Sequence, residues 1–263
     1  MPASDGIPLR DFLEDAFETI EWDELRAVVH ELDAKSHAFQ ARLRPASRLE
    51  HLAPADVNEL LGRMFAVRRQ RDAILRGDGA EKFVRATQTL LYGQEQDLSL
   101  RLDEFLAELD VVNPALGVEV AGELLHMTFP ERYWLWSRWM YDADARTGVL
   151  PLLMDGDKEL RGDSWGQMYL RVGRAIVVVT EVEDAKWLFR GGLAETPALR
   201  PFAIDTFLAA SFCAYLYGVT AWRLTREFHK VLPPLPRLVR RLFGLKTNLP
   251  NGANAPNAPN MPN

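Results

Sequence analysis

The stretch from Gly122 to Asp142, GELLHMTFPERYWLWSRWMYD, contains three of the chain's seven tryptophans within six residues. No other part of the sequence is so dense in side chains that dominate protein cores and interfaces. Aromatic residues of this size each bury roughly 150–250 Å². We therefore expect several elements of the fold to converge on this stretch.

The spacing of apolar residues predicts two helices here. The first runs from Pro114 to Leu125, and Pro130 interrupts the pattern, because proline cannot continue a helix interior but fits the first turn of a new helix. Thr128 is then expected to cap a second helix. On that helix Trp136 and Trp139 would share one face.

The aromatic segment has two interpretations. In the first, it is the core of a helical domain. In the second, it is an exposed face that binds a protein partner, since Trp, Tyr and Arg dominate the energetics of interfaces. The residues of that predicted binding face are Arg132, Trp134, Trp136, Arg138 and Trp139.

The strings FPERY at 129–133 and WSR at 136–138 resemble a segment of helical modules in some bacterial restriction and DNA-repair proteins. The likeness is confined to this short part of the chain, and no residue role is carried over from it.

Outside the aromatic segment, apolar residues recur at helical spacing through most of the chain. The ranges predicted to be helical are 11–39, 55–76, 80–110 with a division near Gly93, 164–179, 206–222 and 238–243. A single short strand is the competing interpretation for 175–182, because that run is rich in β-branched residues. We therefore predict an all-α fold, an irregular multi-helix bundle.

A chain of 263 residues with 48% hydrophobic residues is long enough for a sizeable core. We predict one helical domain over 1–246, with a subdivision near the 142–163 loop as the alternative. The tail at 247–263 is rich in Asn, Pro and Ala, has nothing to bury and is predicted to be disordered. A single cysteine and an N-terminus without a secretory signal predict a cytoplasmic protein.

The formal net charge of -6 argues against a dedicated non-specific nucleic-acid binder. The charge is segregated, however, with an acidic block at 5–33 and basic blocks at 35–76 and 223–246. One function class is therefore a nucleic-acid-associated helical module, in which arginines hold phosphates and a tryptophan stacks on a base. Its candidate residues are Arg63, Arg68, Arg69, Arg71 and Arg76. A solvated or salt-bridged helix face is the simpler interpretation of the same arginines.

The longest uncharged run, 206–222, has 17 residues, fewer than the ~20 that span a bilayer. We favour a buried core helix, with a membrane span as the alternative because basic residues follow it. The basic segment at 235–245 could pack on the core, bind a partner's groove or lie on an anionic surface.

Catalytic motifs are absent from the sequence, including a nucleophile elbow, a dinucleotide glycine fingerprint, Cys-x-x-Cys and His-Glu-x-x-His. We expect no cofactor and no metal. The best candidates for an enzyme are His126 and Glu123, since Glu-x-x-His is half of the ligand set of carboxylate-bridged di-metal proteins. The second half of that set is missing.

The sequence therefore favours a non-catalytic helical adaptor that binds a protein through the aromatic segment and the basic C-terminal helix. The first alternative is the nucleic-acid-associated module with its arginine-rich helix. The second is an enzyme centred on His126.

Overall fold

Helix α7 (Pro114–Thr128) is the central element of the computed structural model, which describes residues 22–95, 97–109, 113–154, 156–181, 192–223 and 233–245. Every residue of α7 from Ala115 to Thr128 is buried. Pro114 occupies the first turn, and the Asn113 side chain accepts a hydrogen bond from the Ala115 N–H, so the start of the helix is capped. A helix that is buried on all sides must be enclosed by other elements.

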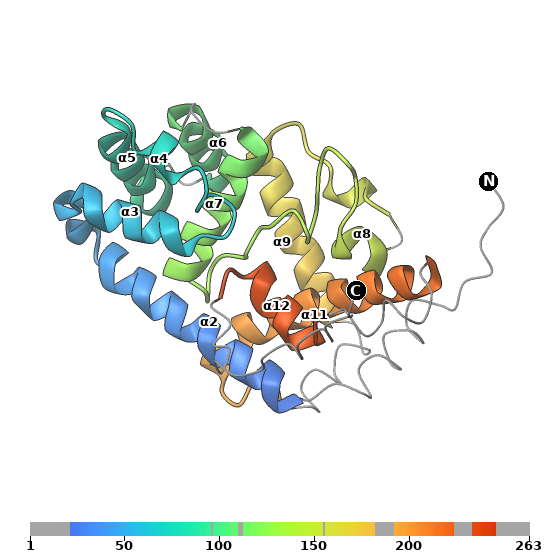
Figure 1. Ribbon diagram of the computed structural model, residues 1–263. Helices are drawn as coiled ribbons and strands as arrows, with labels where there is room; N and C mark the ends of the chain where they lie inside the picture. Colours follow the sequence, from blue (N-terminus) through green and yellow to red (C-terminus); the bar gives the residue numbers. More distant parts are fainter. Residues whose placement is uncertain are drawn as a thin grey trace, which may run out of the picture.

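The enclosing elements are also helices (Figure 1). They are α2 (Trp22–Leu43), α3 (Pro54–Arg63), α4 (Arg71–Ile74), α5 (Gly79–Tyr92), α6 (Leu98–Glu108), α8 (Val149–Leu153), α9 (Trp165–Glu181), α11 (Arg200–Arg223) and α12 (Leu235–Leu242), with 3-10 turns η1 (Ala46–His51), η2 (Lys158–Leu160) and η4 (Pro197–Leu199). Helices α2, α5, α6 and α9 pack on α7. The described residues contain no strand, only one isolated bridge between Asp142 and Thr147. The all-α prediction is confirmed.

The structure tests two details of the predicted helices. Gly93 ends α5, so the predicted division of 80–110 is confirmed. The competing strand at 175–182 is wrong for the described residues, because α9 is helical through Glu181 and the Thr180 hydroxyl donates to the Ile176 carbonyl within the helix. The predicted helix at 11–39 begins at Trp22 in the described residues, while 11–21 and the tail at 247–263 lie outside them.

The predicted continuous helix at 55–76 is wrong. It breaks at Met64, whose backbone is extended (φ -86°, ψ 116°), and residues 65–70 form turns before α4. Met64 and Val67 are both fully buried and anchor this turn in the core. The intervening Phe65 is exposed, as are the arginines that follow Val67.

The predicted second helix after Pro130 is also wrong. Residues 129–148 form turns and extended backbone. The carbonyl oxygen of Tyr133 lies 2.7 Å from Nδ1 of His126, and the Tyr169 hydroxyl donates to the Trp134 carbonyl at 2.7 Å. These carbonyls would bond within a helix, so hydrogen bonds to α7 and α9 replace the helical pattern.

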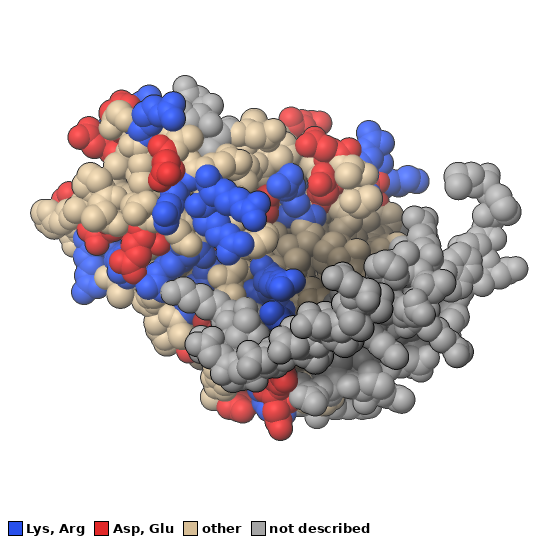
Figure 2. Space-filling model, in the orientation of Figure 1, with Lys and Arg blue, Asp and Glu red and all other residues tan. Residues whose placement is uncertain are grey.

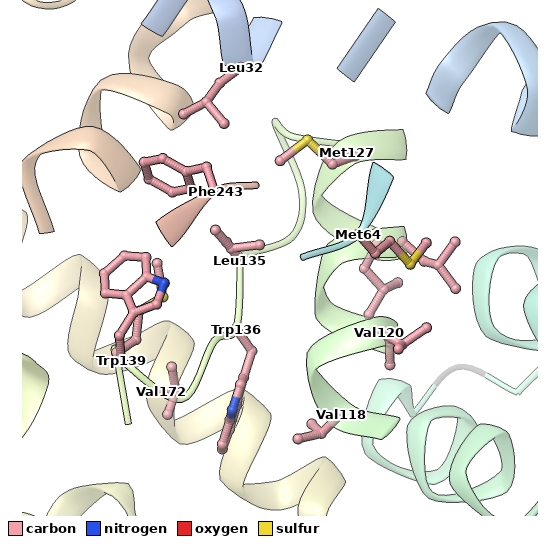
Figure 3. Close-up of a cluster of buried hydrophobic side chains, with 14 of the residues drawn as sticks. Leu32, Met64, Val118, Val120, Met127, Leu135, Trp136, Trp139, Val172 and Phe243 are labelled. Atoms are coloured by element: carbon pink, nitrogen blue, oxygen red, sulfur yellow. The ribbon is translucent and has the colours of Figure 1, made fainter. Parts of the chain in front are cut away.

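Most aromatic side chains of this extended segment are nonetheless buried, among them Trp136 and Trp139, which lie in the core (Figure 3). Trp136 is 2% exposed and stacks on Tyr169, with ring centroids 6.4 Å apart and an interplanar angle of 16°. Trp139 is 8% exposed and contacts Phe212 of α11 and Phe243, which follows α12. The segment therefore joins α9, α11 and the end of α12 at the surface of α7, as its core interpretation predicts.

Two glycines allow the segment to approach its neighbours closely. A Cβ atom at Gly122 of α7 would lie 2.8 Å from Cβ of Trp136 and 2.9 Å from its backbone nitrogen. At Gly173 of α9 it would lie 2.3 Å from Cδ1 of Trp134. Neither position has room for a side chain.

Charged residues at 119, 123 and 126 share one face of α7, because they are spaced four and three apart. Each is buried and paired with a different part of the chain. The pairs are Glu119–Arg138, Glu123–Lys35 and His126–Asp205, with nitrogen–oxygen distances of 2.9, 2.6 and 2.6 Å. They tie α7 to the aromatic segment, to α2 and to α11, and removing one partner would leave a buried charge uncompensated.

The surroundings of the His126 ring favour its doubly protonated form. Its Nδ1 faces the Tyr133 carbonyl and its Nε2 faces the Asp205 carboxylate, so both nitrogens act as donors. Burial lowers the pKa of His126, but the charge and hydrogen bond of Asp205, the Tyr133 carbonyl and the charge of Glu123 raise it, and the net shift is upward. These surroundings thus favour the imidazolium form of His126 in the folded state.

The stretch Pro197–Tyr217, which includes most of α11, is long and apolar enough to cross a membrane, with 21 residues and a mean hydropathy of 1.2. Of its most apolar window, 72% is buried inside the protein. The core helix of a globular protein passes the same test of length and composition, so the stretch does not by itself indicate a membrane span.

Replacing Gly122 with Ala should destabilise the protein by about 1–3 kcal/mol, because overpacking against Trp136 outweighs the gain in helix propensity. Urea unfolding measures the change. The control is Gly62→Ala in α3, where the added carbon would meet only the end of the Arg71 side chain, at 3.2 Å. Gly62→Ala should be neutral or stabilising by up to about 1 kcal/mol. Equal stability of the two variants would contradict the packing described above.

The free energy of unfolding should fall as pH rises above about 6.5, the ordinary pKa of histidine. Because the folded state raises the pKa of His126, its contribution is complete below the unfolded pKa and is lost as pH passes the folded one. Urea unfolding between about pH 6 and 9 measures this slope. Asp205→Asn should flatten it, whatever its effect on overall stability. A slope equal in both proteins would count against the imidazolium.

Candidate functional site

Lysine and arginine side chains gather on one face of the protein (Figure 2). Residues of these two types line two hollows, A and B. Hollow A has a volume of about 1140 Å³ and hollow B about 800 Å³. Hollow A is lined by Glu24, Glu31, Ala34, Lys35, Asn58, Glu59, Gly62, Arg63, Arg71, Pro234, Arg237, Arg240, Gly244 and Leu245. Hollow B is lined by Phe65, Ala66, Arg68, Arg69, Glu119, Ser137, Arg138, Trp139, Asp142, Arg146, Thr147, Gly148, Pro151, Leu152, Phe212, Tyr215, Leu216 and Leu242.

The charge of this face is opposite to that of the chain. Nine cationic side chains and five carboxylates line the two hollows, whereas the whole sequence carries a formal net charge of -6. The cations come from distant parts of the chain: α2, the turn at 64–70 with its flanking helices, the aromatic segment and α12. The fold therefore collects positive charge that the sequence distributes widely.

The turn at 64–70 forms the ridge between the hollows. Arg63 and Arg71 at its two ends line hollow A, while Arg68 and Arg69 line hollow B. Phe65 stands on the ridge with 43% of its surface exposed, and the Arg68 guanidinium lies 4.6 Å from its ring centroid. The break at Met64 is what turns these arginines toward two different hollows.

Gly244 supports the ridge from the other side. Its φ of +66° belongs to the left-handed region, which favours glycine. A Cβ atom there would lie 2.9 Å from Cβ of Phe65. The chain after α12 can therefore approach the ridge only with glycine at this position.

All three carboxylates that line hollow A are already paired. Arg240 donates to Glu31 at 2.9 Å and to Glu24 at 3.4 Å. Glu59 accepts from Arg63 at 2.8 Å, and the pKa of Glu59 is lowered, chiefly by this hydrogen bond. These pairs neutralise the acidic side of the hollow and leave other cations there to meet an incoming anion.

Two arginines of hollow A retain capacity for an anion. The nearest carboxylate to Arg71 is that of exposed Asp72, at 3.7 Å. Nε of Arg237 is buried and has no hydrogen-bond partner among the described residues. A buried donor without a partner costs about 1–3 kcal/mol unless something accepts from it.

Hollow B combines a buried acid with a cationic rim. Burial raises the pKa of Glu119, and this effect is opposed by the hydrogen bonds and charge of Arg138 and by the Ser137 hydroxyl. Arg68, Arg69 and Arg146 form no salt bridge to a carboxylate in the part of the chain that the structure describes. Those three side chains leave the hollow with net positive charge.

The predicted nucleic-acid residues are largely brought together. Arg63, Arg68, Arg69 and Arg71 are exposed around the ridge, whereas Arg76 is exposed but lines neither hollow. The sequence interpretation missed the other five cations that line the hollows, which are Lys35, Arg138 in this role, Arg146, Arg237 and Arg240. The basic block at 223–246 includes Arg237 and Arg240, but no sequence pattern indicated a role for Arg146.

The predicted protein-binding residues separate. Trp136 and Trp139 are in the core, and Trp139 also lines hollow B, with 8% of its surface exposed. Arg138 is exposed on hollow B. Arg132 is exposed and Trp134 is partly buried, and both lie away from the two hollows.

The catalytic candidates are enclosed. His126 is buried and lines neither hollow, and its two nitrogens are occupied as described above. Glu123 pairs with Lys35 beside a cavity of about 20 Å³, which has room for about one water molecule. Among the described residues, no cluster of three or more His, Cys, Asp or Glu side chains could hold a metal ion.

Comparisons with protein-family models, with curated protein sequences and with solved structures find no significant match to this chain.

Proposed function

We propose that the arginine-lined face binds single-stranded nucleic acid. The observation that carries this proposal is the gathering of arginines from the 64–70 turn, the aromatic segment and α12 around two hollows of an otherwise acidic protein. A positively charged face on an otherwise acidic protein attracts a polyanion to that face.

The arginines around the ridge suit phosphate groups. A guanidinium presents several donors in a rigid fork that matches phosphate oxygens, and it stays charged at all physiological pH values. Arg68 and Arg69 line hollow B together with Arg146, and Arg71, two residues after Arg69, lines hollow A. A strand that crosses the ridge would meet cations on both sides of it.

Exposed aromatic and apolar groups among these arginines favour an unpaired strand over a duplex. Proteins that bind single strands combine a cationic groove with aromatic side chains on which bases stack. Phe65 is the exposed ring on the ridge, and it is the candidate for such stacking. A tryptophan is not, because those of the aromatic segment are buried or lie away from the hollows.

The protein adaptor that the sequence favours has less support from the geometry. Trp136 and Trp139, its two central residues, contribute to the core. The basic helix α12 buries Pro236 and Val239, and Arg240 pairs with two carboxylates of α2. What remains exposed on both elements is mainly cationic and fits the nucleic-acid proposal equally well.

A fluorescently labelled single-stranded oligonucleotide should bind with an affinity that falls steeply with salt. If about four phosphates are held, the slope of log K against log salt concentration should be about -3. The double variant Arg68→Gln/Arg69→Gln should bind at least about tenfold more weakly at low salt and reduce the slope by about 1.4. Fluorescence anisotropy over a salt series measures both quantities.

A matched control separates this face from net charge alone. Arg171 and Arg174 are exposed on α9, line neither hollow, and can be replaced by glutamine with the same change in charge. The control should keep the wild-type slope. Equal losses in the two double variants, or no binding by the wild type at low salt, would refute the proposed function.

A further inference from the structure

Hollow B differs from a simple cationic groove because it has depth and an apolar side. Its volume of about 800 Å³ is within the range of about 300–1,000 Å³ typical of small-molecule sites. Phe212, Leu216 and Leu242 line it from α11 and α12, and Phe65 lines it from the ridge. Leu216 is 42% exposed, so apolar surface on this wall is open to a ligand.

Besides these apolar residues, hollow B is lined by polar groups that differ in their burial. The Ser137 hydroxyl and the Glu119 carboxylate form its buried polar part, held together by the bond between them at 3.2 Å. Arg68, Arg69 and Arg146 form the cationic rim. Such a site would favour a ligand with a flat, weakly polar body and an anionic group at one end.

A nucleoside phosphate has this distribution of chemistry. Its base could lie against the apolar wall and present its edge to the buried polar groups, while its phosphate meets the arginine rim. We infer that hollow B binds one nucleobase together with its 5′-phosphate. The inference rests on the proposed function and specifies which part of a strand enters the protein, namely an unstacked nucleotide at an end or in a single-stranded stretch.

The first test compares three groups of small ligands by isothermal titration calorimetry with the full-length protein. The ligands are the four nucleoside 5′-monophosphates, ribose 5-phosphate and inorganic phosphate. At least one nucleotide should bind about tenfold or more tightly than ribose 5-phosphate, because the base adds stacking and apolar contact. Equal affinity for that nucleotide and ribose 5-phosphate, or no nucleotide binding, overturns the inference.

The second test obstructs the apolar wall without changing charge. Leu216→Trp places a larger side chain at the exposed edge of hollow B and should weaken nucleotide binding at least about tenfold. Val178→Trp is the control, because Val178 is 55% exposed on α9 and lines neither hollow. It should bind nucleotide as the wild type does. Unchanged nucleotide binding in folded Leu216→Trp would place the nucleotide elsewhere and overturn the inference.

The two proposals can fail separately. Salt-dependent oligonucleotide binding without a preference for nucleotides over ribose 5-phosphate leaves the proposed function standing and removes the nucleotide site. Nucleotide binding that Leu216→Trp abolishes, without any oligonucleotide binding, supports the site and removes the proposed function. If Leu216→Trp does not fold, the ligand comparison on the wild-type protein decides the inference.

Discussion

The structure depends on burying three charged residues along one face of α7. Glu119, Glu123 and His126 lie inside the protein, where an unpaired charge would be strongly destabilising. Each finds its partner on a different element, so the pairs fix the aromatic segment, α2 and α11 relative to the central helix. Apolar packing alone would allow several arrangements of helices around an apolar rod, whereas matched buried charges restrict the arrangement.

The same pairs connect the core to the cationic face. Lys35 and Glu119 line both the small cavity beside α7 and one of the two hollows, and Arg138 extends from its bond with Glu119 into hollow B. The ridge at 64–70 is anchored separately, through the buried side chains of Met64 and Val67. Attachment of this kind holds in place the backbone that carries the ridge arginines before any ligand arrives, which reduces the entropy cost of binding.

The sequence predicted the structural features that depend on local periodicity, and it did not predict those that depend on tertiary contacts. The helical class, α7 and the division at Gly93 follow from spacing, proline and glycine. The extended course of 129–148 does not, because the backbone of that segment bonds to His126 and Tyr169, which local spacing does not identify as partners. The arginines at 63–71 indicated about half of the cations of the candidate site. Only tertiary structure brings them together with Arg146 and the arginines of α12.

The most direct test of this account is a double-mutant cycle on the Lys35–Glu123 pair, measured by urea unfolding. Lys35→Met and Glu123→Gln should each destabilise the protein by about 3–5 kcal/mol, because each removes one charge of the pair and leaves the other charge uncompensated in the core. The double variant should be more stable than the sum of the single effects predicts, with a coupling of about 1–3 kcal/mol. Additive effects within about 0.5 kcal/mol would show that the buried charges act independently, and would contradict the account.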